Sequence, residues 1–135
     1  MKFEDIPWKK IVTDNETFTV FEDGFPVTEG HLLFVPKHDT PDCLSECYKC
    51  AYLTGVYWVE QGYCDSYNIG QNIGKEAGQT VMWPHIHLIP RRKGDMDDPR
   101  GGVRHVIPEK GNYKRNSDII RYENYCNTDR RSKQI

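Results

Sequence analysis

Two histidines lie two residues apart within the apolar run QTVMWPHIHLIP, residues 79–90. Near neutral pH an imidazole can act as a nucleophile, a general acid or base, or a metal ligand. Alternate side chains of an extended strand share one face, so His85 and His87 would project side by side, together with Trp83. An isolated buried histidine is usually a hydrogen-bonded core residue, but a pair on one face favours a reactive or binding site.

The segment before the histidines, NIGKEAGQTV, is rich in glycine and small polar residues. Short side chains and exposed backbone amides form the concave donor sets that bind anions such as phosphate. We expect such a set here from Asn72, Gly74, Gly78, Gln79 and Thr80. Phosphate bound beside histidine indicates phosphoryl or nucleotidyl chemistry.

Metal binding is the alternative use of these residue types. His31, His85 and His87 could together hold zinc, because H-x-H on a strand can supply two ligands. Three cysteines follow a C-x3-C-x2-C pattern, namely Cys43, Cys47 and Cys50. That spacing also places them on one buried helix face, where reduced cysteine packs as a small hydrophobe, and a structural zinc needs a fourth ligand. We therefore favour packing for the cysteines and expect no metal or other cofactor.

The composition predicts one globular domain in a chain of 135 residues, of which 37% are hydrophobic and 28% charged. A formal net charge of −2 does not indicate a nucleic-acid partner. No apolar stretch reaches the roughly 18 residues of a membrane span, and the start MKFEDIPWKK lacks the apolar core of a secretory signal. We expect a cytoplasmic protein with reduced cysteines.

The apolar periodicities predict how these residues are positioned. Strands are expected at ETFTVFED, HLLFVP, YNIG and QTVMWPHIHLIP, with QNIGKEAG as a turn. One long helix is expected between them, capped by Thr40, with Pro41 at its first position and apolar residues continuing to about Tyr63.

The region after the histidines, up to about residue 113, is rich in glycine, proline and charge. We expect a surface loop there, with one brief strand at VRHVIP. The basic residues of this loop are Arg91, Arg92, Lys93, Arg100 and Arg104. They either face solvent or reach the distal phosphates of a long substrate or a nucleic-acid end, and we favour the first. Residues 114–135 are expected to form a polar tail, partly helical around Ile119–Tyr125.

The succession FEDGFPVTEGHLLFVPKH, YNIGQNIGKEAGQTV and HIHLIPRRKGD resembles the histidine-triad (HIT) family over about Val12–Tyr113. The family's hallmark is H-φ-H-φ-H, where φ is apolar, preceded by an AGQ-type turn. The continuation through VRHVIP looks like bacterial members labelled as diadenosine tetraphosphate hydrolases. The resemblance implies an α+β fold: an antiparallel sheet of about five strands, one long helix and a shorter helical element. It implies a HIT-like domain at residues 1–113 and a homodimer.

The resemblance also assigns roles to individual residues. His85 falls on the nucleophile, which would attack the α-phosphorus of a nucleotide and form a covalent nucleotidyl-histidine. We expect a backbone carbonyl to accept from its other ring nitrogen and fix its tautomer. His87 and His31 fall on histidines beside the phosphate, and Gln79 falls on a glutamine that contacts the phosphate or bridging oxygen.

The remaining expected contacts concern the nucleotide. The phosphate would meet Asn72, Gly78 and Thr80, the ribose Asp23, and the base Phe21 and Trp83. Asp23 also fits ordinary turn chemistry, since it lies in EDG. Trp83 departs from the family pattern, because it occupies the place of the first triad histidine.

The function predicted from the sequence is a nucleotide hydrolase or transferase. It would cleave a dinucleoside polyphosphate or a nucleoside phosphoramidate, with a purine nucleoside conjugate as the expected partner. The alternatives are a module that binds a nucleotide without turnover because Trp83 replaces a histidine, and a metal enzyme. His38 and His105 are expected at the surface, and the tyrosines of the long helix in packing or a dimer contact.

Overall fold

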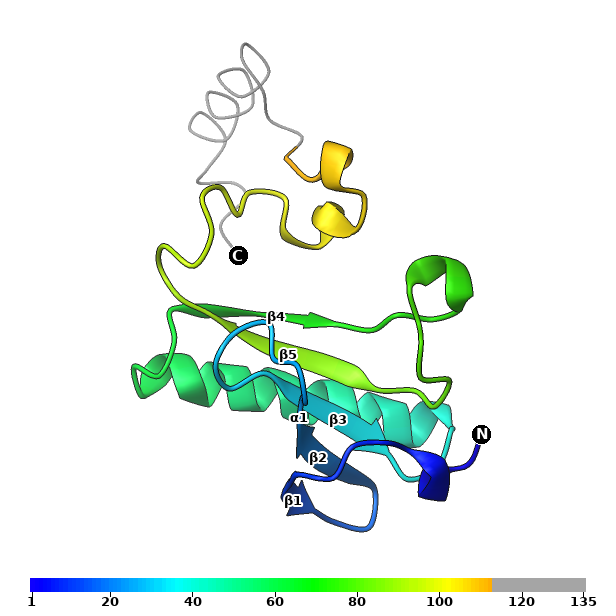
Figure 1. Cartoon of the computed structure of the whole chain (residues 1–135). Helices are drawn as coiled ribbons and strands as arrows, with labels where there is room; N and C mark the ends of the chain where they lie inside the picture. The colour runs from blue at the N-terminus through cyan, green and yellow to red at the C-terminus, as the bar shows by residue number, and fades with distance from the viewer. Residues whose placement is uncertain (113–135) are drawn as a thin grey trace, which may run out of the picture. The chain divides into compact units, whose positions relative to one another are not determined.

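The computed structural model describes residues 1–112, and within them a five-stranded antiparallel sheet carries one long helix (Figure 1). The order across the sheet is β1-β2-β3-β5-β4. The strands are β1 (Ile11–Asp14), β2 (Phe18–Glu22), β3 (Leu32–Pro36), β4 (Ser66–Gly70) and β5 (Ile86–Arg91). The helix is α1 (Pro41–Glu60), and short 3₁₀ helices are η1 (Phe3–Asp5), η2 (Lys75–Ala77), η3 (Gly102–Val106) and η4 (Pro108–Lys110). The predicted α+β architecture is confirmed.

The long helix begins where its capping residues predict. The Thr40 hydroxyl accepts a hydrogen bond from the Cys43 amide at 3.3 Å, and Pro41 follows at the first helical position. The helix ends at Glu60, three residues before the predicted end, because the backbone turns to a positive φ of 76° at Gly62.

The helix packs on the sheet through small residues. Cys47, Ala51 and Gly55 are its buried residues, and Cys50 packs against the same core. Burial raises the pKa of the Cys47 thiol to about 12, so this sulfur is an inert packing group. No cluster of three metal-binding groups in residues 1–112 includes a cysteine, which agrees with the packing interpretation.

The two faces of the sheet carry different clusters. Towards α1 the core contains Val20, Phe34, Ile86 and Leu88, among others. On the other face, Phe21, Leu33 and Val35 pack with the N-terminal segment, through Phe3, Ile6 and Trp8, and with Trp83. The predicted alternation along the histidine strand is therefore confirmed from Ile86 onward, and His87 faces away from the helix.

The histidine strand is shorter than predicted. The strand β5 begins only at Ile86, which pairs with Phe34, while His87 pairs with Leu33 on one side and Gly70 on the other. Pro84 has no amide hydrogen to donate, so the ladder cannot extend towards Trp83. His85 therefore lies at the point where the chain leaves a loop and enters the sheet.

The strand predicted at VRHVIP is wrong. Residues from Met96 onward form a second compact unit, and its described part, up to Asn112, contains η3 and η4. Gly101 and Gly102 have positive φ and fold the chain into a turn, and Pro108 begins the second helix. The helix predicted around Ile119–Tyr125 lies outside the described residues.

No helix within residues 1–112 is both long enough and apolar enough to cross a membrane.

Candidate active site

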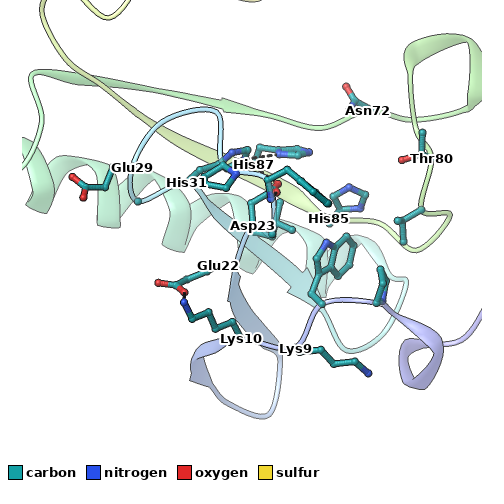
Figure 2. A pocket seen from close by; sticks show the side chains of 18 of the residues that line it. Lys9, Lys10, Glu22, Asp23, Glu29, His31, Asn72, Thr80, His85 and His87 are labelled. Carbon is teal, nitrogen blue, oxygen red and sulfur yellow. Dashed lines mark hydrogen bonds and ion pairs between the residues drawn. The ribbon is translucent and has the colours of Figure 1, made fainter.

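A cavity of about 860 Å³ opens on the sheet face opposite α1. Figure 2 shows the side chains of His31, His87 and His85 in a row within it, with Asp23 beside them. Seven of the residues predicted for the site line this cavity: Asp23, His31, Asn72, Gly78, Thr80, His85 and His87. Segments far apart in the sequence thus supply one site.

His85 is held with one ring nitrogen occupied and the other available. Its Nδ1 lies 2.8 Å from the Trp83 carbonyl oxygen, as the sequence analysis predicted for the nucleophile. A carbonyl can only accept, so Nδ1 carries a proton, and in the neutral ring Nε2 keeps its lone pair. The ring of Trp8 lies 4.7 Å from the His85 ring, centroid to centroid, and His85 is only 8% exposed. This imidazole has the tautomer and orientation that a nucleophile needs.

His31 and His87 form a directly hydrogen-bonded pair beside His85. His31 Nε2 lies 2.8 Å from His87 Nδ1, and the rings of His85 and His87 lie 5.2 Å apart. Burial, assisted by the neighbouring His31 and His85 rings, lowers the pKa of His87 to about 4. Burial also lowers the pKa of His31, although Asp23 acts in the opposite direction. Both rings are therefore neutral at physiological pH.

Asp23 combines the two roles considered for it. Its Oδ1 accepts a hydrogen bond from the Phe25 amide at 2.7 Å, which is the expected turn chemistry. Its Oδ2 lies 3.5 Å from His31 Nε2 at the cavity wall. The turn therefore engages only one of the two carboxylate oxygens of Asp23.

The glycine-bearing turn contributes fewer free amides than predicted. The amides of Gly78 and Gln79 both donate within the turn, to the carbonyls of Lys75 and Gly74. Gly78 adopts φ +95°, which closes the turn. The expectation of exposed amides at these two positions is wrong, whereas Asn72 and Thr80 do reach the cavity (Figure 2).

Four residues predicted for the site do not line the cavity, namely Gly74, Gln79, Phe21 and Trp83. Gln79 braces the turn by accepting from the Gly74 amide at 2.9 Å and donating to the Val81 carbonyl at 3.0 Å. Phe21 is buried beneath Trp8, with ring centroids 6.1 Å apart. Trp83 donates its indole N–H to the Pro36 carbonyl at 2.8 Å and packs edge-on against Phe3.

The basic residues at the end of β5 and directly after it have partners within the same unit. Arg91 makes a two-point contact with Asp95, and Arg92 donates to the carbonyls of Glu29 and Tyr63. Neither they nor Lys93 line the cavity.

The N-terminal wall of the cavity was not predicted from the sequence. Pro7, Trp8, Lys9 and Lys10 line it, and Phe25 lines it from the loop between β2 and β3. Lys10 is paired with Glu22 at 2.9 Å. The available signal was the apolar trio Ile6, Pro7 and Trp8 within an otherwise charged start, a pattern without strand or helix periodicity.

Comparisons with known proteins agree with this geometry. A family model described as the HIT domain matches residues 5–94. An uncharacterized HIT-like protein of Methanocaldococcus jannaschii is 37% identical over 93 residues, covering 64% of this chain and 71% of the relative. The adenosine 5'-monophosphoramidase of Saccharomyces cerevisiae is 36% identical over 99 residues, covering 65% of this chain and 57% of the enzyme.

A solved structure shares the fold. The zinc-bound histidine triad family protein from Mycobacterium smegmatis superposes with a TM-score of 0.59 and 34% sequence identity. The match covers 68% of this chain and 71% of that protein.

Proposed function

Because this chain belongs to the HIT domain family, we propose that it is a nucleotide hydrolase or transferase that cleaves its substrate at the α-phosphate. The substrate class is a purine nucleoside conjugate, either a dinucleoside polyphosphate or a nucleoside phosphoramidate. The observation that carries the proposal is the hydrogen bond that His85 Nδ1 donates to the Trp83 carbonyl, which leaves Nε2 available in a cavity that His31, His87, Asn72 and Thr80 also line. The yeast relative named as a monophosphoramidase supports this substrate class.

The reaction proceeds in two displacements. His85 Nε2 attacks the α-phosphorus, a P–N bond forms, and the bond to the leaving group breaks. The Nδ1–H of His85 remains bound to the Trp83 carbonyl, which stabilises the positive charge that the ring acquires. Water then attacks the nucleotidyl-histidine and releases the nucleoside monophosphate. Asn72, Thr80 and His87 are the groups proposed to contact the phosphate, and Asp23 the group proposed to bind the ribose.

The geometry argues against a resident metal. Asp23, His31 and His87 offer ligand atoms within 4.8 Å of one another. However, two imidazole nitrogens bound to one tetrahedral zinc stand about 3.3 Å apart, given Zn–N bonds of about 2.0 Å. The corresponding nitrogens of His31 and His87 are 2.8 Å apart, which is a hydrogen-bond distance. A zinc held by His31 Nε2 and His87 Nδ1 would therefore require this pair to open by about 0.5 Å.

We expect the purified protein to turn over at least one member of a panel of adenosine and guanosine polyphosphates and phosphoramidates. Chromatography of the products should show a nucleoside monophosphate, and activity should survive a chelator. Rapid quenching followed by intact-mass measurement should reveal a nucleotidyl adduct. Micromolar binding of a monophosphate with no turnover of any conjugate would instead identify a binding module. Loss of activity on chelation would identify a metal enzyme.

We also propose that the protein acts as a homodimer. Within the described residues, β4 pairs only with β5, and its other edge has no partner strand. The adjacent helix exposes Tyr48, Tyr52 and Tyr57, of which Tyr57 is 60% exposed. An unpaired strand edge beside exposed aromatic side chains suits a second copy of the same chain.

Sedimentation equilibrium should report twice the monomer mass, and Tyr57→Glu should shift the protein towards monomer at micromolar concentration. The matched control is Val12→Glu, because Val12 is exposed on β1 at the opposite edge of the sheet. A wild-type protein that sediments as a monomer contradicts the homodimer.

A further inference from the structure

The loop between β2 and β3 contacts His31 through a backbone amide. The backbone amide of Val27 donates a hydrogen bond to His31 Nδ1 at 3.1 Å. An amide N–H can only donate, so His31 Nδ1 must carry a lone pair rather than a proton. A neutral imidazole has one N–H, which places the proton of His31 on Nε2.

This assignment fixes the next ring in the row. His31 Nε2 lies 2.8 Å from His87 Nδ1, so with the proton on His31 the nitrogen of His87 is the acceptor. The proton of neutral His87 must then lie on Nε2. This is the ring nitrogen of His87 that is not engaged by His31 and can contact a ligand. The carboxylate of Asp23, 3.5 Å from His31 Nε2, favours the same arrangement by attracting that proton.

We infer that the Val27 backbone amide is a positioning group that sets the tautomers of His31 and His87 together. The last step of this inference rests on the proposed function. In that step, His87 donates a hydrogen bond from Nε2 to the substrate phosphate. With the opposite tautomers, His87 would present a lone pair to a phosphate oxygen, and the two would repel each other.

The loop that carries the amide is itself tied to the strand that carries His87. The Thr28 hydroxyl donates to the Pro90 carbonyl of β5 at 2.6 Å, and Arg92 Nη1 donates to the Glu29 carbonyl at 2.9 Å. The Arg92 guanidinium lies over the ring of Tyr63, 4.7 Å from its centroid. Gly30 completes the loop with φ +94°, and a Cβ there would collide with the Tyr63 hydroxyl.

The side chain of Val27 contributes little to this arrangement. It is 69% exposed, so the contact depends on the main chain. The amide can therefore be removed with little change in packing, by incorporating the α-hydroxy acid analogue of valine, which replaces the N–H by an ester oxygen. Val27→Ala is the matched control because it shortens the side chain and keeps the N–H.

Nitrogen-15 NMR of the histidine rings reports the tautomers directly, without substrate. In the wild type and in Val27→Ala we expect both His31 and His87 to carry the proton on Nε2. In the ester variant the oxygen faces His31 Nδ1 and favours a proton there, so both rings should change to the Nδ1–H form. His85 should keep its Nδ1–H in all three proteins, which provides an internal check that the site is folded.

Steady-state kinetics tests the functional half of the inference. We expect the ester variant to lose about 10²-fold in kcat with little change in KM, the scale seen when one donor to a developing negative charge is removed. A proton on His31 Nδ1 in the wild type overturns the tautomer assignment, whatever the activity. Changed tautomers with unchanged kcat overturn the donor role of His87. If no substrate is turned over, the proposed function fails, and the NMR result still decides the tautomers.

Discussion

His85→Ala is expected to lower kcat/KM by on the order of 10⁵-fold, because removing a nucleophile eliminates the covalent route rather than weakening it. The ring is 8% exposed, and its orientation is fixed by the Trp83 carbonyl on one side and by Trp8 on the other. No other imidazole in the cavity can replace it, since His31 and His87 are hydrogen-bonded to each other. The measurement is product formation from the best substrate of the panel, at equal enzyme concentration.

The matched control is His38→Ala, because His38 is an exposed histidine just after the end of β3. It should keep wild-type turnover. A further variant, His85→Gly, leaves a space for free imidazole, which should restore part of the rate if the missing group is a nucleophile. Comparable turnover in His85→Ala and the wild type would refute the covalent mechanism. So would the absence of a nucleotidyl adduct under conditions where the wild type turns over.

Much of the fold was predictable because local signals and tertiary packing agree. Thr40 and Pro41 mark the start of α1, while the alternation around Phe18–Glu22 and the short apolar run at Leu32–Pro36 mark the two strands of the central hairpin. The strand β1 was missed because all four of its residues are exposed, so it lacks a buried face and the periodicity that would reveal one. VRHVIP was mistaken for a strand because a short apolar run does not distinguish a strand from a helical turn.

The composition of the site was less predictable than the fold. His85 and His87 were identified by residue type and spacing, His31 by the resemblance to the HIT family, and the carbonyl that orients His85 was expected on chemical grounds. Trp8 and Val27 were not identified. Trp8 reaches the nucleophile only because the N-terminal segment packs on the sheet, and Val27 acts through a main-chain amide, which every residue except proline possesses. Both contributions depend on tertiary position, and that of Val27 leaves no mark in residue type.

Trp83 connects the packing of the sheet to the orientation of the nucleophile. Its indole N–H donates to the Pro36 carbonyl at the end of β3, and its own carbonyl accepts from His85 Nδ1, both at 2.8 Å. The side chain thus anchors the backbone group that fixes the tautomer of His85. Trp83 stands where the family has its first histidine, and the indole supplies an N–H that an imidazole could also supply.

Trp83→Ala should therefore reduce both stability and turnover. Loss of a half-buried indole and its hydrogen bond should lower the free energy of unfolding by about 2 kcal/mol, measured by urea denaturation. The Trp83 carbonyl would lose its anchor, so kcat should fall about tenfold or more, the scale expected when a reacting group loses its fixed orientation. Trp83→Phe keeps a smaller aromatic ring beside Phe3 and removes the indole N–H, so the lost hydrogen bond alone should cost about 1 kcal/mol.

Trp83→His tests whether the tryptophan performs the supporting role of the family's first histidine or whether that role is lost in this chain. If the indole already performs the supporting role, the histidine variant should be no faster than the wild type and less stable, because the smaller ring leaves part of the space beside Phe3 and Leu33 unfilled. Turnover raised tenfold or more in Trp83→His would show the opposite. His85 would then be a nucleophile whose support this chain has lost, and the protein would be closer to a nucleotide-binding module than to an efficient hydrolase.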